Sequence, residues 1–372
     1  MSRTLHVTRP DAPIGTIQAR AYAIPTDKPE ADGTFAWEAT TLVVVEVAGG
    51  GRTGLGYTYA DASNAPLIEA TLARAVQGLD AMDPPHAYAA MRHAVRNLGH
   101  GGLAATAISA VDAALWDLKA KLLDLPLATL LGRLRDAVPI YGSGGFTTYT
   151  DDELREQLSG WVTRDGCGAV KMKIGTDPSR DPHRVRAARA AIGAADLFVD
   201  ANGAFSAKQA LFYAQIFAAE DVRWFEEPVS SDDLAGLALV REAGPPGMDV
   251  AAGEYGYTPD YFARMLAAGA VDCQQADLTR CGGVTAFGRV AALCEAHGID
   301  LSGHCAPAIH LHAACAAPRL RHLEWFHDHV RIERMLFDGA PVARSGLIRP
   351  DLSRPGHGLE FRAADAVRFA ID

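Results

Sequence analysis

The chain has 372 residues, of which 49% are hydrophobic and 22% are charged, and its formal net charge at pH 7 is -10. This composition excludes a globally disordered chain and permits a large core, and the length favours one large domain with a smaller one. An acidic chain without a basic block has no evident attraction for nucleic acid or an anionic membrane, so we expect neither as a partner.

Targeting signals and disulfides are not evident either. No apolar run is long enough to cross a bilayer, and the first 15 residues lack the hydrophobic region of a secretory signal. The six cysteines form no CxxC pair, and we interpret them as reduced thiols that mostly pack in the interior. These observations predict a cytoplasmic protein.

The first third of the chain predicts a small α+β module. Residues 15–24 alternate apolar and polar side chains, and residues 40–47 are rich in β-branched residues. A GGGR turn at 49–52 leads into a third strand at 54–59. Three helical patterns follow, at residues 64–77, 85–96 and 102–122. A sheet followed by a run of helices is typical of an α+β module.

From residue 138 onward, short apolar strands alternate with amphipathic helices. The strands are predicted at residues 138–141, 169–173, 197–200, 222–226, 249–253, 272–275, 299–302 and 321–324. The helices between them are predicted at residues 150–163, 181–191, 206–219, 231–242, 258–268, 283–297 and 308–317. Because one helix separates each pair of strands, the strands should be parallel, and eight parallel strands close a barrel.

The pattern therefore predicts an α/β fold with three segments. We expect an N-terminal α+β capping domain at residues 1–130, a (β/α) barrel at 131–335, and a C-terminal segment at 336–372 that returns to the capping domain.

Three acidic residues end or directly follow successive barrel strands: Asp200, Glu226 and Glu254. The carboxyl ends of parallel barrel strands meet at one rim, where three carboxylates would repel one another without a cation. A hard divalent cation with oxygen ligands resolves this repulsion, so we predict Mg²⁺, with Mn²⁺ as the alternative. A helix N-cap is the competing interpretation for a single Asp, but it does not account for three residues in successive units.

Lys171 and Lys173 end the second barrel strand in the sequence AVKMK. Residues two apart on a strand share a face, and two neighbouring ammonium groups lower each other's pKa. A lysine with a lowered pKa can act as a general base, although a KxK pair is also common on surfaces. We therefore predict that one lysine of this pair can act as a base.

Three further rim residues complete the predicted chemistry. His304 and Asp277 follow adjacent strands, and an aspartate orients a histidine ring and raises its basicity. Glu324 ends the eighth strand, where it can donate a proton or hydrogen bond to a substrate carboxylate, although a surface ion pair fits its position equally well. Asn202 in DANG is a predicted substrate contact, but DANG is also a good turn.

Taken together, these motifs resemble the mandelate racemase subgroup of the enolase superfamily. The motifs are KMK at 171–173, DANG at 200–203, WFEEP at 224–228, GE at 253–254, ADLTRCGGVT around Asp277, and His304 in SGH. The resemblance covers nearly the whole chain and implies a modified (β/α)8 TIM-type barrel under its cap. A lysine at the end of the sixth strand would indicate muconate-cycloisomerase-like proteins, and Asp277 stands there instead.

The resemblance also implies residue roles. Lys173 is the base on one face of the substrate with Lys171 as its companion, and the Asp277–His304 pair serves the opposite face. Asp200, Glu226 and Glu254 bind Mg²⁺, and Glu324 is the electrophile. The implied reaction removes the α-proton of a small-molecule carboxylate to give an enediolate.

The function that we expect first is dehydration of an acid sugar to a 2-keto-3-deoxy product. Racemisation or epimerisation, and lactone cycloisomerisation, are alternatives that share the first step. A non-catalytic, metal-stabilised binding protein is a rival of another class. We expect specificity loops in the cap near residues 25–37 and 57–63, with Lys28, Tyr57 and Tyr59 as contacts, and a homo-oligomeric assembly.

Overall fold

The computed structural model describes residues 12–371 and contains a capping region and a closed barrel. The cap has one antiparallel sheet of three strands: β1 (Ile14–Ala31), β2 (Ala36–Gly49) and β3 (Arg52–Tyr59). Its helices are α1 (Asn64–Leu67), α2 (Ala73–Val76), α3 (Pro84–Ala94), α4 (Leu103–Leu122) and α5 (Leu127–Leu131). The proposed absence of a secretory signal concerns residues that lie mostly outside the described range.

The barrel confirms the predicted alternation of strands and helices. Its strands are β4 (Val138–Gly144), β5 (Ala169–Lys173), β6 (Asp196–Asp200), β7 (Val222–Glu226), β8 (Asp249–Ala252), β9 (Cys273–Ala276), β10 (Asp300–Gly303) and β11 (Leu320–Phe326). Its helices are α6 (Asp151–Gly160), α7 (Asp181–Ala191), α8 (Ala207–Ala218), α9 (Leu234–Ala243), α10 (Pro259–Ala267), α11 (Gly283–His297), α12 (Pro307–Ala316) and α13 (His327–Leu336). Neighbouring strands are parallel, and β11 pairs with β4 to close the ring.

Aromatic side chains fill the barrel below the rim. Phe198 and Trp224 stack with ring centroids 5.2 Å apart, and Tyr141 lies 5.4 Å from Phe198. These rings belong to a small buried cluster with Ala251 and Cys273. The barrel interior is therefore a packed floor and not a channel, and the polar rim lies above it.

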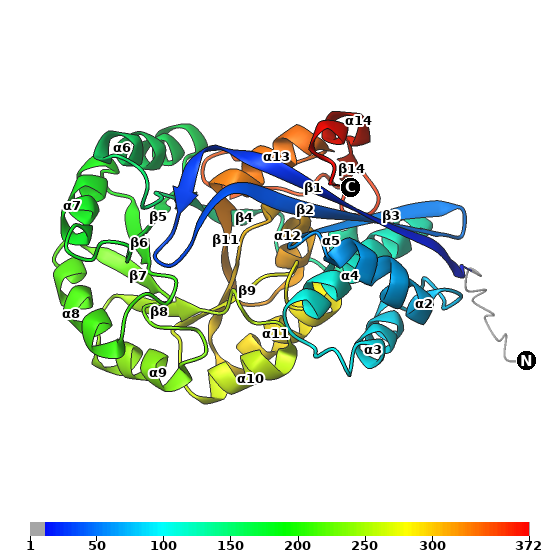
Figure 1. The fold of residues 1–372 in the computed structure, drawn as a ribbon, viewed down its shortest axis with the longest axis horizontal. Helices are drawn as coiled ribbons and strands as arrows, with labels where there is room; N and C mark the ends of the chain where they lie inside the picture. Colours follow the sequence, from blue (N-terminus) through cyan, green and yellow to red (C-terminus); the bar gives the residue numbers. More distant parts are fainter. Residues whose placement is uncertain (1–11, 372) are drawn as a thin grey trace, which may run out of the picture.

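The β1–β2 hairpin is longer than predicted and extends from the cap sheet across the barrel (Figure 1). Prediction ended the first strand at Ile24, before the polar residues TDKPE, but β1 continues to Ala31. Pro25 is tolerated because β1 is an edge strand, and the register shifts between Pro25 and Glu30. The tip is tied to the barrel rim by hydrogen bonds from Thr147 to Ala31 (2.9 Å) and from Thr176 to Asp32 (2.6 Å).

The C-terminal segment runs back along the barrel to the cap. It contains β12 (Phe337–Asp338), β13 (Leu347–Ile348), β14 (Glu360–Phe361) and α14 (Ala363–Ala366). Strand β13 pairs with β4, and the Ile371 N–H donates to the carbonyl of Ala21 in β1 at 3.0 Å. The segment boundaries that we expect at residues 130 and 335 stay a prediction.

All six cysteines are free and buried, in agreement with their interpretation as packing residues. Within residues 12–371, no helix combines the length and the apolar character that a membrane span requires.

Candidate active site

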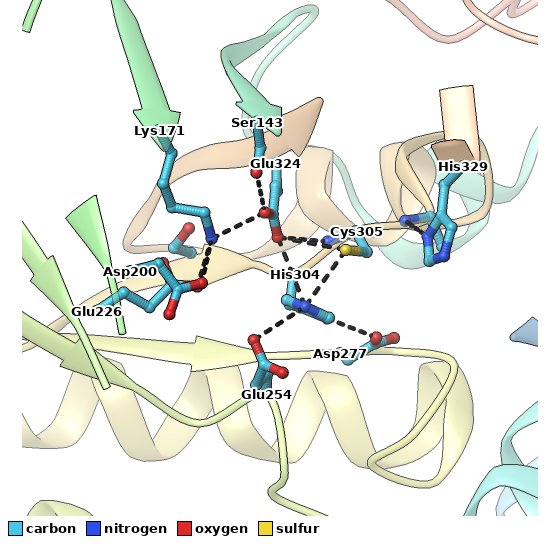
Figure 2. A network of polar contacts seen from close by, with 12 residues as sticks. Ser143, Lys171, Asp200, Glu226, Glu254, Asp277, His304, Cys305, Glu324 and His329 are labelled. Carbon is cyan, nitrogen blue, oxygen red and sulfur yellow. Dashed lines mark hydrogen bonds and ion pairs between the residues drawn. The ribbon is translucent and has the colours of Figure 1, made fainter. Parts of the chain in front are cut away.

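The structure gathers the eight predicted catalytic and metal-binding residues at one end of the barrel. Figure 2 labels all of them except Lys173. They come from seven successive strands, in the order Lys171 and Lys173, Asp200, Glu226, Glu254, Asp277, His304 and Glu324. Their positions follow from the topology, because each residue lies at or just beyond the carboxyl end of its strand. In strand order, the three carboxylates of the predicted metal site follow β5, which carries Lys173, and precede β10, which leads to His304.

The three carboxylates of the predicted metal site, Asp200, Glu226 and Glu254, are close enough to share one ion. One oxygen from each lies within 4.8 Å of the others, and all three side chains are buried. Burial and the negative charge of Asp200 raise the pKa of Glu226 to about 8. Buried carboxylate oxygens that repel one another at this spacing fit a hard divalent cation.

The two lysines provide positive charge beside this group. Lys173 Nζ lies 2.5 Å from an Asp200 oxygen and 3.1 Å from Asn202 Oδ1. Lys171 Nζ forms an ion pair with Glu226, lies 2.8 Å from Glu324, and sits 5.5 Å from the centre of the Tyr141 ring. Both ammonium groups therefore point toward the carboxylates from β5.

The lysine pKa differs from the simple expectation. Burial and the charge of Lys171 lower the pKa of Lys173, but Asp200 and the other carboxylates outweigh them, so the pKa lies above its ordinary value. The motif KMK identifies the lysines but not the number of carboxylates that face them, and the lowered pKa that we expect beside a bound dication stays a prediction.

His304 and Asp277 form the predicted pair. His304 Nδ1 lies 2.8 Å from Asp277 Oδ2, and Asp277 Oδ1 accepts hydrogen bonds from the backbone and hydroxyl of Thr279, both at 2.7 Å. The other ring nitrogen, Nε2, lies 3.2 Å from Glu254. Burial would lower the pKa of His304, but Glu254 and Glu324 raise it well above its ordinary value. The ring is thus fixed on one side and faces the acidic site on the other.

Glu324 lies between Lys171, at 2.8 Å, and His304, at 3.7 Å (Figure 2). Its Oε1 accepts a hydrogen bond from the Ser143 hydroxyl at 2.5 Å, and its Oε2 accepts one from the Cys305 N–H at 3.1 Å. Burial raises its pKa, but Lys171 and His304 outweigh burial and hold the pKa below its usual range. A carboxyl group held by this many donors is well oriented toward the cavity.

A cavity of about 470 Å³ joins these residues to the cap. Its barrel side includes Lys173, Asn202, Glu254, His304 and Glu324. Its cap side is formed by the tip of the β1–β2 hairpin and the end of β3, including Asp32, Phe35, Trp37, Tyr59 and Asp61. Parts of both loops that we predicted to set specificity thus face the rim residues across one space.

Of the four predicted substrate contacts, Lys28 and Tyr57 do not reach this cavity, and Tyr59 lines it. Asn202 lines it, as expected. Tyr57 is fully buried and donates a hydrogen bond to Glu333 at 2.6 Å, so it has no surface to offer a substrate. Lys28 is half-exposed, pairs with Glu153 at 2.8 Å, and is not among the cavity residues. Tyr57 and Tyr59 are two residues apart on β3 and share a face, but Tyr57 lies deeper, against Phe337 and Glu333, and only Tyr59 lines the cavity.

Arg280 and His329 were not predicted and line the cavity. The Arg280 side chain lies 3.5 Å from Asp277 and donates a hydrogen bond to the Glu254 carbonyl at 3.2 Å. His329 stacks on Tyr59 with ring centroids 3.5 Å apart, and burial lowers its pKa to about 3. Arg280 follows Asp277 by three residues in the same turn, which was the available signal; His329 lies beyond the last strand, where no strand end marks it.

Comparison with known families covers most of the chain. The model of the mandelate racemase/muconate lactonizing enzyme N-terminal domain matches residues 19–132. The enolase C-terminal domain-like model matches residues 153–366. These two ranges correspond to the cap with its helices and to the barrel with its returning segment.

Individual proteins match over the same extent. The 3,6-anhydro-alpha-L-galactonate cycloisomerase of Streptomyces coelicolor is 33% identical, over 96% of this chain and 99% of its own length. A mandelate racemase/muconate lactonizing enzyme-like protein from Rubrobacter xylanophilus is 52% identical with a TM-score of 0.94, covering 96% of this chain and 100% of that structure. The L-talarate/galactarate dehydratase of Salmonella typhimurium, solved with Mg and L-lyxarohydroxamate, is 28% identical with a TM-score of 0.89, covering 100% and 96%.

Proposed function

The chain belongs to the mandelate racemase/muconate lactonizing enzyme family, and we propose that it is a magnesium-dependent sugar-acid dehydratase. One observation supports this proposal above all others. In strand order, a buried group of three carboxylates lies between β5, which carries the lysine pair, and the ends of β9 and β10, which carry Asp277 and His304; Lys173, Glu254 and His304 line one cavity. The arrangement provides two candidate bases, Lys173 and His304, beside a candidate site for a divalent cation.

Asp200, Glu226 and Glu254 would hold the Mg²⁺. When bound, the cation supplies Lewis-acid stabilisation of the negative charge that develops on the substrate carboxylate. Lys171 and Glu324 lie 2.8 Å apart and face the same region, so Lys171 can contribute a positive charge there, and Glu324 would have to be protonated to donate a hydrogen bond to the same end of the substrate.

Proton transfer is assigned to the two flanking groups. Lys173 takes the α-proton of a substrate with one configuration at C2, and the electron pair of the C–H bond moves into the carboxylate. His304 donates a proton to the hydroxyl on the neighbouring carbon, which leaves as water, and the resulting enol becomes the 2-keto-3-deoxy acid by tautomerisation. Asp277 holds the His304 ring in position through the 2.8 Å contact at Nδ1.

Cycloisomerisation is a second candidate. A relative that spans 96% of this chain is a cycloisomerase of an anhydro sugar acid. In that reaction the leaving oxygen belongs to a ring of the substrate, so elimination opens the ring and no water is released. Both candidates need the same α-proton abstraction, and product analysis separates them.

Exchange of the substrate α-proton with D₂O is the decisive experiment. A library of sugar acids with both C2 configurations is incubated with the Mg²⁺-loaded enzyme, and deuterium at C2 is followed by NMR. Lys173→Ala should abolish exchange for one C2 configuration and His304→Asn for the other, each by at least about 10²-fold, because each variant removes the base on one side.

Lys28→Ala is the matched control, since it removes an exposed lysine that lies outside the cavity and should leave exchange unchanged. Exchange retained in both active-site variants would contradict the assigned roles. No exchange with any sugar acid would contradict the proposed reaction and favour the non-catalytic binding protein.

A further inference from the structure

The two walls of the active-site cavity differ in charge. All basic side chains that line it come from the barrel: Lys173, Arg280, His304 and His329. The cap contributes two carboxylates, Asp32 and Asp61, together with aromatic and hydroxyl side chains, and no basic residue. We propose that the cap wall is a binding site for a neutral, hydroxyl-bearing end of the substrate, which makes the substrate class monocarboxylate sugar acids and not dicarboxylates. This inference rests on the proposed function.

Asp32 and Asp61 keep an oxygen available for a ligand. Asp61 Oδ1 accepts hydrogen bonds from the Ser63 N–H at 2.8 Å and the Ser63 hydroxyl at 2.5 Å. Asp32 Oδ1 accepts from the N–H groups of Thr34 at 2.6 Å and Phe35 at 2.7 Å. Within residues 12–371 neither aspartate has a basic partner, and no hydrogen bond reaches the second oxygen of either. Each second oxygen can therefore accept a hydrogen bond from a substrate hydroxyl.

An aromatic surface lies beside these carboxylates. Trp37 is fixed by a 2.8 Å hydrogen bond from its indole N–H to the buried Glu30, and it stacks with Phe35 at 6.2 Å between ring centroids. Phe326 approaches from the barrel, and the buried Phe146 contacts both Trp37 and Phe326 edge-on. Flat apolar faces between anionic acceptors suit the C–H face of a sugar and its hydroxyl edge.

A second carboxylate on the substrate would meet unfavourable charge here. It would approach Asp32 and Asp61 with no cation on the cap wall to compensate, and like charges in a partly desolvated cavity repel strongly. A neighbouring cavity shares Asn202 and Tyr255 and contains Arg264, but that arginine is exposed at its outer edge. A dicarboxylate directed there would leave the aromatic surface unused.

The test uses matched pairs that differ only at the distal carbon: gluconate with glucarate, and galactonate with galactarate, with 3,6-anhydrogalactonate as a cyclic monocarboxylate. Deuterium exchange at C2 and product formation are measured for the Mg²⁺-loaded enzyme. We expect kcat/KM for a monocarboxylate to exceed that for its paired dicarboxylate by at least about tenfold, the ordinary effect of one uncompensated charge.

Two variants of Asp61 test the cause of the preference. Asp61→Asn keeps the hydrogen bond to Ser63 and removes the charge. The kcat/KM for the dicarboxylate should therefore rise several-fold relative to that for the paired monocarboxylate. Asp61→Lys supplies a cation and should raise the dicarboxylate-to-monocarboxylate ratio of kcat/KM by at least about tenfold. Asp196→Lys is the matched control: it makes the same charge change on an exposed residue at the opposite end of β6 and should leave the ratio unchanged.

The outcomes separate this inference from the proposed function. Equal or better turnover of dicarboxylates would overturn the assignment of the cap wall while the reaction stands, and so would an unchanged ratio in both Asp61 variants. A fall in dicarboxylate turnover in Arg264→Ala alone would place the distal group in the neighbouring cavity. No exchange with any compound would overturn the proposed function together with the inference.

Discussion

Residues with unusual backbone conformations gather around the rim of the barrel. Seven non-glycine residues between 12 and 371 have a positive φ, and four of them are Asn202, Glu227, Cys305 and Ala306. They lie just beyond the ends of β6, β7 and β10, next to Asp200, Glu226 and His304. A positive φ is disfavoured for residues with a Cβ and persists only where the surrounding contacts impose it, which is common at functional sites.

The strand ends explain how much of this site could be predicted. Lys173, Asp200 and Glu226 end recognisable apolar strands, so parallel topology alone brings them together. Arg280 and His329 lie in segments whose path depends on tertiary contacts, and no periodicity marks them. The raised pKa of Lys173 could not be predicted from the sequence either, because it depends on how many carboxylates surround the ammonium group.

Asp277→Asn tests whether Asp277 acts through His304. The change keeps the shape of the side chain but removes the charge opposite Nδ1, so the pKa of His304 should fall. We expect kcat to drop by about 10–100-fold. The alkaline limb of the pH–rate profile should shift to lower pH, because the His304 ring loses its proton at a lower pH in this variant.

Exchange catalysed from the Lys173 side provides the internal control for Asp277→Asn, and it should be nearly unaffected. If activity from both sides fell equally, with an unshifted profile, Asp277 would have only a structural role.

At the level of elements, the β1–β2 hairpin joins the cap to the active site. Its inner part is an ordinary sheet, but its outer part is polar and crosses the barrel rim. The sequence there shows neither alternation nor apolar character, so prediction ended the strand too early. The register shifts between Pro25 and Glu30, and Asp32, Phe35 and Trp37 beyond this shift line the cavity; hydrophobic periodicity does not reveal such a shift.

Close packing of β3 on α4 holds the base of this hairpin. Gly54 and Gly56 face the helix, and a Cβ at Gly56 would lie well inside the contact distance of the Ala110 carbonyl oxygen. The backbone of α4 cannot yield as a flexible side chain would. Two glycines on one face of a strand therefore let the helix approach, and the sequence alone does not show which element approaches them.

Gly56→Ala should therefore destabilise the fold by about 3 kcal/mol or more through overpacking, measured by chemical denaturation. Gly288→Ala is the control on an exposed position of α11 where a Cβ meets no atom, and it should stabilise by about 0.5–1 kcal/mol. Equal effects of the two substitutions would show that β3 and α4 do not pack as described.

On the scale of the whole molecule, buried polar contacts connect the cap to the barrel. Tyr57 of β3 donates to Glu333 of α13, Thr58 donates to the Thr279 carbonyl at 2.8 Å, and Asp112 of α4 accepts from Thr285 at 2.9 Å. Burial raises the pKa of Glu333 to about 8 and that of Asp112 to about 7. The homo-oligomeric assembly that we expect stays a prediction.

These carboxyls should make stability depend on pH. Glu333 titrates near 4.5 when unfolded and at about 8 when folded, so the folded state binds more protons in that window. The stability it contributes therefore falls as pH rises from about 4.5 to 8. Glu333→Gln does not titrate, so its unfolding free energy relative to the wild type should rise by at most about 1.4 kcal/mol per pH unit there.

Chemical denaturation at several pH values measures this difference. Glu46→Gln, an exposed position on β2, is the control and should give a flat difference. A flat difference for Glu333→Gln as well would show that Glu333 is solvated in the folded protein.

The hairpin that crosses the barrel has a consequence for how such proteins diversify. Under the proposed function, reaction and selectivity would be encoded by separate stretches of polypeptide: strand ends after residue 169 and a hairpin and strand before residue 62. A substitution at the hairpin tip can change which compound is admitted without moving a single proton-transfer group. Substitutions in the cap would then change the substrate while the proton-transfer groups on the barrel stay in place.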